Sequence, residues 1–143
     1  MKKITILFLG LLLSVQGFTQ TSNDTVISNN PQNLKVKVMY FHITNRCHTC
    51  FSIEANVRKT VNDYFKTALD SGMVALSVMN CELPENAALV KKYNAYGATL
   101  ALTSYKNGKE VTSVDLTNWA FQKIHDPEIF ISELKFKIDQ FLK

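Results

Sequence analysis

The stretch that decides the fold is Val36-Lys37-Val38-Met39-Tyr40-Phe41, followed after a short loop by Cys47-His48-Thr49-Cys50. The first segment alternates apolar and polar residues and then becomes apolar on both faces, which is typical of a strand inside a covered sheet. After the cysteines, apolar residues recur at helical spacing (Ile53, Val57, Val61, Tyr64, Ala68). The sequence therefore predicts a strand, a loop that carries two cysteines, and a helix of about five turns.

Further elements follow the helix, which we expect to end at Ser71-Gly72. Residues 73–79 are apolar except for Ser77 and predict a buried parallel strand. Pro84 opens a short helix over residues 85–93, because proline is tolerated early in a helix. Residues 98–105 predict a third strand.

The C-terminal half predicts a hairpin and a last helix. Lys106-Asn107-Gly108-Lys109 has the turn chemistry of a tight hairpin, with residues 111–116 as the partner strand. Asp126 caps the last helix and Pro127 takes its first position. The inner face of that helix consists of Phe130, Leu134, Ile138 and Phe141. The order β-α-β-α-β-β-α predicts an α/β domain with one mixed sheet and helices on both sides.

This order resembles the thioredoxin-like fold, a three-layer α/β/α sandwich that carries a Cys-x-x-Cys motif at the same place. The resemblance covers nearly all of residues 34–143. More narrowly, the chain resembles a family of small exported bacterial proteins, the ArsF-like nitrophenyl compound nitroreductase subunits. The shared features are Tyr40-Phe41-His42, Pro84-Glu85-Asn86, Tyr96-Gly97 and residues 106–110.

The chain departs from the thioredoxin pattern in two places. Thioredoxins usually have a cis-proline before the third strand, but here Ala98 stands in Gly97-Ala98-Thr99. A cis bond before a non-proline residue costs about 2.5–4 kcal/mol, so we expect Ala98 to be trans. The family's tryptophan before the first cysteine is replaced by Asn45-Arg46.

The cysteine pair points to thiol–disulfide exchange. Cys47 is the expected attacking sulfur, because a helix N-terminus favours the thiolate and the neighbouring Arg46 and His48 can do the same. Cys50, one turn further along, is the expected resolving thiol. The alternative of a purely structural disulfide is disfavoured by loop entropy, since a four-residue loop stabilises by about 2 kcal/mol and a fifteen-residue loop by about 3.

The leading functional prediction is an exported thiol–disulfide oxidoreductase that acts on client thiols or disulfides, or on a redox partner protein, without a cofactor. One alternative is soft-metal (copper or zinc) binding, with His42, His48 and Cys81 as additional ligands. Another is a non-catalytic thioredoxin-like adaptor that binds a partner through Trp119. The sequence does not determine the direction of the redox reaction.

The N-terminal part predicts export. Residues 1–19 combine Lys2 and Lys3 with an apolar stretch too short to span a bilayer, as in a cleaved signal peptide ending after Gly17 or Thr19. Residues 20–33 predict a flexible linker, and residues 34–143 the thioredoxin-like domain. We expect a periplasmic or secreted bacterial protein with no membrane association after cleavage. Without Lys2 and Lys3 the net charge falls from +4 to +2, and it is spread along the chain, which disfavours nucleic-acid binding.

Five other side chains have weaker indications. Cys81 closes the second strand and is read as a small buried residue, an alternative bridge partner or an intermolecular thiol. His42 is a candidate for shaping the site, with a structural histidine as the simpler interpretation. His125 precedes the Asp126 cap and is expected to be exposed. Trp119 is expected to cover the sheet edge together with Phe121.

Overall fold

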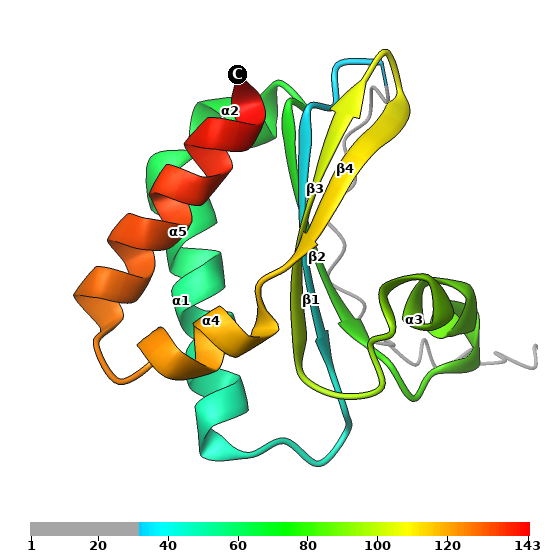
Figure 1. Ribbon diagram of the computed structural model, residues 1–143, viewed down its shortest axis with the longest axis vertical. Coiled ribbons are helices and arrows are strands. Elements are labelled where there is room, and N and C mark those ends of the chain that lie inside the picture. The colour runs from blue at the N-terminus through cyan, green and yellow to red at the C-terminus, as the bar shows by residue number, and fades with distance from the viewer. Residues whose placement is uncertain (1–31) are drawn as a thin grey trace, which may run out of the picture.

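The computed structural model describes residues 32–143, which form a four-stranded sheet with helices on both faces (Figure 1). The predicted signal peptide and nearly all of the predicted linker lie outside these residues. The elements are β1 (Val36–His42), α1 (His48–Tyr64), α2 (Lys66–Asp70), β2 (Val74–Asn80), η1 (Pro84–Asn86), α3 (Ala87–Tyr93), β3 (Thr99–Lys106), β4 (Lys109–Asp115), α4 (Thr117–Lys123) and α5 (Pro127–Leu142).

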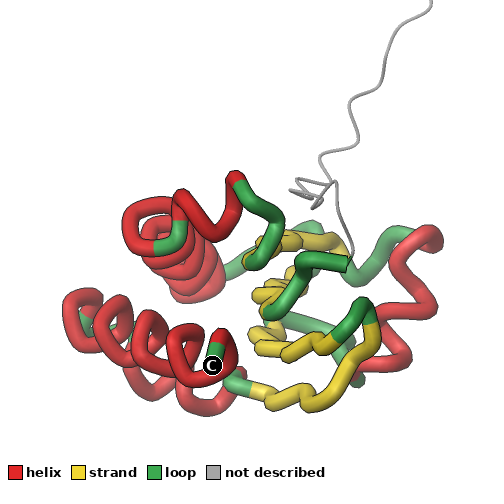
Figure 2. The backbone as a smooth tube through the Cα atoms, turned by 90° about the horizontal axis from the view of Figure 1, so that it is seen from above, coloured by secondary structure: helices red, strands yellow, loops and turns green. Residues whose placement is uncertain are grey.

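The sheet is mixed, in the order β2-β1-β3-β4. β1 pairs in parallel with β2 and antiparallel with β3, and β4 is the hairpin partner of β3. Seen from above in Figure 2, the sheet lies between two long helical segments on one side and a short one on the other. This is the predicted thioredoxin-like α/β/α arrangement.

β1 is apolar on both of its faces because a hydrophobic cluster lies on each side of the sheet. Val36, Val38 and Tyr40 face the α1 and α5 side, where they belong to the larger hydrophobic cluster. Met39 and Phe41 face α3 and belong to the smaller one. All five side chains are at most 1% exposed. β1 is therefore the central strand that the sequence pattern predicts.

The predicted five-turn helix is divided into α1 and α2 at Phe65. Phe65 has a non-helical backbone (φ −123°, ψ 19°) and is 5% exposed, whereas Tyr64 is 53% exposed. The prediction that Tyr64 lies on the inner face is therefore wrong. Phe65 follows Val61 by four residues and fills that place in the core. The helical segment ends at Asp70, directly before the predicted Ser71-Gly72, and Gly72 has a φ of 76° that glycine readily adopts.

The hairpin turn and the start of α5 are confirmed. Asn107 and Gly108 both have positive φ values, 52° and 72°, as a two-residue type I′ turn requires. The Asp126 carboxylate accepts a hydrogen bond from the Ile129 amide at 3.1 Å, and Pro127 takes the first helical turn. The buried face of α5 includes Phe130, Leu134 and Ile138, each 0% exposed.

Helix α4 was not predicted. Trp119, which the sequence suggested as cover for the sheet edge or as a partner-binding residue, lies in this helix, with its ring 4.8 Å from that of Phe130. Its indole N–H donates to Glu133 at 2.7 Å. Trp119 thus joins α4 to α5. Phe121 is 38% exposed.

Among the helices described within residues 32–143, none has the length and hydropathy that a membrane span requires.

Candidate active site

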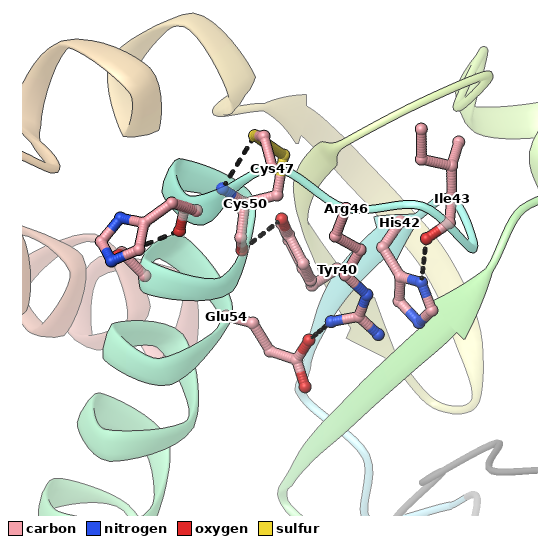
Figure 3. The surroundings of a disulfide bond; sticks show 9 residues. Tyr40, His42, Ile43, Arg46, Cys47, Cys50 and Glu54 are labelled. Atoms are coloured by element: carbon pink, nitrogen blue, oxygen red, sulfur yellow. Dashed lines mark hydrogen bonds and ion pairs between the residues drawn. A yellow bond between two sulfur atoms is a disulfide. The ribbon is translucent and has the colours of Figure 1, made fainter.

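Cys47 and Cys50 form a disulfide at the start of α1, with their Cα atoms 5.2 Å apart (Figure 3). Cys47 is the N-cap residue of the helix, with extended backbone angles, and its sulfur accepts a hydrogen bond from the Cys50 amide at 3.2 Å. Cys47 is exposed and Cys50 is half-buried. The more exposed cysteine is thus the one at the helix terminus, in the position expected for the attacking residue.

The location of Cys47 has a chemical consequence for the reduced protein. The first amides of a helix have no acceptor within the helix, and they carry the positive end of its dipole. A thiolate at the N-cap accepts hydrogen bonds from these amide N–H groups, as the oxygen of a capping side chain does. The charged form of the sulfur is therefore stabilised relative to the thiol. The local structure therefore favours ionisation of Cys47 over that of Cys50.

Tyr40 of β1 contacts the Cys-x-x-Cys motif through its hydroxyl group. Its hydroxyl donates to the Cys50 carbonyl at 2.8 Å, and its side chain is 1% exposed in β1. Burial raises the pKa of Tyr40 to about 12, with the Glu54 charge adding to this effect and the Arg46 charge opposing it. The phenol therefore remains protonated and a donor at neutral pH. From the sequence, Tyr40 was expected in the strand and was among the residues of the family resemblance, but no role beside the cysteines was predicted for it. The signal was a hydroxyl-bearing side chain on a buried strand just before the motif.

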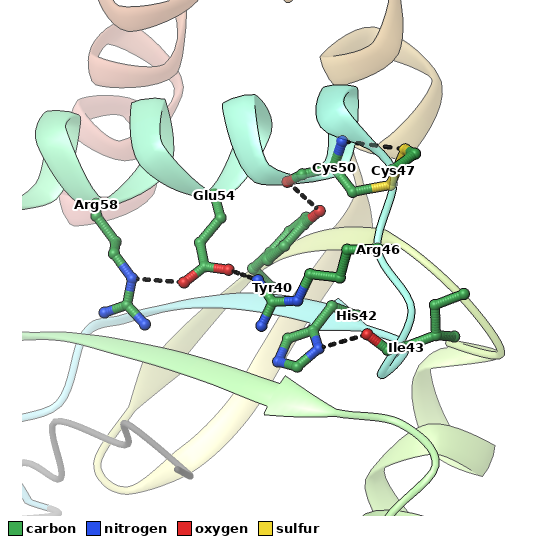
Figure 4. A network of polar contacts seen from close by, with 8 residues as sticks. All are labelled: Tyr40, His42, Ile43, Arg46, Cys47, Cys50, Glu54 and Arg58. Carbon is green, nitrogen blue, oxygen red and sulfur yellow. Dashed lines mark hydrogen bonds and ion pairs between the residues drawn. A yellow bond between two sulfur atoms is a disulfide. The ribbon is translucent and has the colours of Figure 1, made fainter.

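Arg46 does not have the orientation that the sequence suggested. Its guanidinium forms an ion pair with Glu54, which also accepts from Arg58 at 2.8 Å (Figure 4). Its side chain extends from the loop toward Glu54 rather than toward the sulfurs. Burial opposes ionisation of Glu54, but the hydrogen bonds from Arg58 and Arg46 outweigh it, so the pKa of this carboxyl lies below its ordinary value. The charge of Arg46 is therefore offset by an ionised partner that it shares with Arg58.

An open groove with a volume of about 680 Å³ adjoins the motif, and Arg46, Phe51, Glu54 and His42 are among its lining residues. Phe51 is 56% exposed, and the Arg46 guanidinium lies 5.2 Å from the centre of its ring. His42 is buried, with Nδ1 donating to the Ile43 carbonyl at 3.0 Å. Burial lowers the pKa of His42. These contacts agree with the structural interpretation of His42 and place it at the edge of the site.

Cys81 is not bonded to the motif. It is a free, half-buried cysteine packed against the smaller hydrophobic cluster, and burial raises the pKa of its thiol. Its amide donates to the His42 carbonyl at 2.7 Å. His48 and His125 are both exposed. Within residues 32–143, no group of three or more His, Cys, Asp or Glu side chains is arranged to hold a metal ion.

The loop before β3 differs from that of thioredoxins as the sequence predicts. No peptide bond within residues 32–143 is cis, so Ala98 is trans. Tyr96 in the same loop is 72% exposed.

No protein-family model matches the chain, and no curated protein matches it. Among solved structures, the chain is similar to oxidized mitochondrial thioredoxin 3 from Saccharomyces cerevisiae, with 18% identity and a TM-score of 0.41 over 69% of this chain and 85% of that one. It is also similar to a structure described as that of a malarial protein, with 21% identity and a TM-score of 0.39 over 64% of this chain and 98% of that one. The ArsF-like resemblance is not supported.

Proposed function

We propose that this protein is an exported thiol–disulfide oxidoreductase whose active site is the Cys47–Cys50 pair. The observation that carries this proposal is the exposed residue Cys47 at the N-cap of α1, bonded to a half-buried partner one turn along. Thiol–disulfide exchange needs an accessible thiolate and a nearby thiol that resolves the mixed disulfide. The two cysteines supply both.

The reaction can be written from these positions. In the reducing direction, the Cys47 thiolate attacks one sulfur of a client disulfide, forms a mixed disulfide and releases one client thiolate. Cys50 then attacks the Cys47 sulfur, re-forms the bond between the two cysteines and releases the second client thiolate. The protein loses two electrons and the client disulfide gains them. The oxidising direction is the reverse of these steps.

Export is part of the proposal and is supported by the sequence of residues 1–19. The linker over residues 20–33 and the domain over residues 34–143 then form the mature protein, in a periplasm or outside the cell. An oxidising compartment suits a protein that exchanges disulfides. N-terminal sequencing of the full chain expressed in a bacterium tests this: a start after Gly17 or Thr19 supports export, and an intact Met1 in the cytosol contradicts it.

The enzymatic proposal is tested by reduction of insulin disulfides with dithiothreitol as the electron source. We expect catalysis by the wild type and at least a hundredfold loss in Cys47→Ser, because Cys47 is the exposed cysteine at the N-cap of α1 and Cys50 is half-buried. Cys81→Ser is the matched control, since it makes the same replacement outside the motif, and we expect it to be fully active. Wild-type activity in Cys47→Ser would show that the assignment is wrong.

The order of the two cysteines has a separate test. In Cys50→Ser the mixed disulfide on Cys47 has no resolving thiol, so it accumulates and can be isolated with the client attached. Cys47→Ser does not form such an adduct. If instead the adduct accumulates through Cys50 in Cys47→Ser, the roles of the two sulfurs are reversed.

A further inference from the structure

Arg46 and Glu54 form a fixed pair on one side of the motif. Their side chains are only 15% and 14% exposed, and Glu54 is held from its other side by Arg58. Arg46 directly precedes Cys47, whereas Glu54 follows Cys50 by one helical turn. The pair therefore joins the loop that carries Cys47 to the body of α1, as Figures 3 and 4 show.

An arginine beside a cysteine normally favours the thiolate, because an opposite charge within a few ångströms stabilises the ionised form. Here the positive charge has an ionised carboxylate in direct contact. The potential that these paired charges produce at the adjacent residue Cys47 is smaller than that of the guanidinium alone, and the guanidinium is itself directed toward Glu54 rather than toward the sulfurs. Glu54 therefore limits how strongly Arg46 can stabilise the Cys47 thiolate.

We propose that Glu54 is a positioning residue that sets the redox equilibrium of the Cys47–Cys50 pair by holding and neutralising Arg46. This inference rests on the proposed function and adds to it the residue that tunes the site. Reduction places two electrons and up to two protons on the pair, breaks the S–S bond and leaves Cys47 as the sulfur most readily ionised. Whatever stabilises that thiolate favours the reduced form and makes the disulfide a stronger oxidant.

Other ionisable side chains surround the motif from the elements packed at this end of the sheet. They are Tyr40 and His42 of β1, His48 and Arg58 of α1, and Glu82 after β2. The test therefore has to change the Arg46–Glu54 pair and leave these groups in place.

The experiment compares Glu54→Gln with Asp63→Asn, which removes one carboxylate from an exposed ion pair with Lys59 on the same helix. For each protein, the equilibrium constant for reduction by dithiothreitol and the pKa of Cys47, from thiolate absorbance, are measured without any client. In Glu54→Gln we expect at least a threefold shift toward the reduced form and a lower Cys47 pKa. We expect Asp63→Asn to match the wild type.

The double variant Arg46→Gln/Glu54→Gln identifies the origin of the shift, which should disappear when Arg46 is also removed. The proposal is overturned if Glu54→Gln matches the wild type, or if the double variant keeps the shift of Glu54→Gln. If Glu54→Gln does not fold, the Cys47 pKa is measured in Arg46→Gln instead. A pKa above that of the wild type supports the proposal, and an unchanged or lower pKa overturns it. Failure of insulin reduction by the wild type would refute the proposed function without altering these equilibrium measurements.

Discussion

Replacement of Tyr40 by phenylalanine removes one hydroxyl group beside the Cys47–Cys50 disulfide and nothing else. In the wild type this hydroxyl donates to the Cys50 carbonyl at 2.8 Å from a side chain that is 1% exposed. A buried hydrogen bond contributes about 0.5–1.5 kcal/mol net. The carbonyl also has a backbone donor within the helix, so it is not left without a partner. We therefore expect Tyr40→Phe to lower the free energy of unfolding by about 1 kcal/mol.

Urea or thermal unfolding of the oxidised protein measures this change. For a domain of this size, about 1 kcal/mol corresponds to a decrease in Tm of roughly 4 °C. Tyr64→Phe is the matched control, because Tyr64 is 53% exposed on α1 and should change stability by less than about 0.5 kcal/mol. If both variants unfold at the wild-type midpoint, the Tyr40 hydroxyl does not support the motif, and our account of the site is wrong on this point.

The remaining predictions concern the core, a helix cap and the response to alkali. Leu134→Ala should cost about 2–5 kcal/mol by urea unfolding, since Leu134 is 0% exposed, whereas Ile129→Ala at a 43% exposed position of the same helix should cost far less; equal losses would contradict the packing of α5. Asp126→Ala should cost about 1 kcal/mol by removing the cap on the Ile129 amide, and Asp126→Asn should retain most of the stability. The pKa values of Tyr40 and Tyr105 are both raised to about 12, so the fold favours their neutral forms. Their contribution to the free energy of unfolding is complete below about pH 10 and is lost as pH rises toward 12. The free energy of unfolding should therefore fall less steeply with pH in Tyr40→Phe than in the wild type. Identical pH profiles of the two proteins would count against the burial of Tyr40.

Much of the fold could be predicted because local chemistry and tertiary structure agree in these segments. Asn107-Gly108 supplies two residues that tolerate positive φ, and Asp126-Pro127 supplies a cap and a first helical residue. The double apolar character of β1 identified the central strand. Each of these signals depends on a few neighbouring residues, so it can be read without knowledge of the rest of the molecule.

The errors arose where tertiary contacts decide the outcome. α4 has no side-chain cap at Leu116, and its indole contact with Phe130 joins residues far apart in sequence. Phe65 rather than Tyr64 enters the core because the two helical segments meet there. In the same way, the motif could be located from the sequence, but the direction of Arg46 could not, because its partner Glu54 lies two helical turns further along.

The two hydrophobic clusters on opposite faces of the sheet differ in size, and this has a consequence for local opening. Eighteen buried residues make up the cluster under α1 and α5, and only six make up the one under α3. Segments with fewer buried contacts open at lower free energy than the global transition. The amides of α3 should therefore exchange with deuterium sooner than those of α1, and Cys81, packed on the smaller cluster, should be alkylated through that partial opening while the helix bearing the disulfide stays closed.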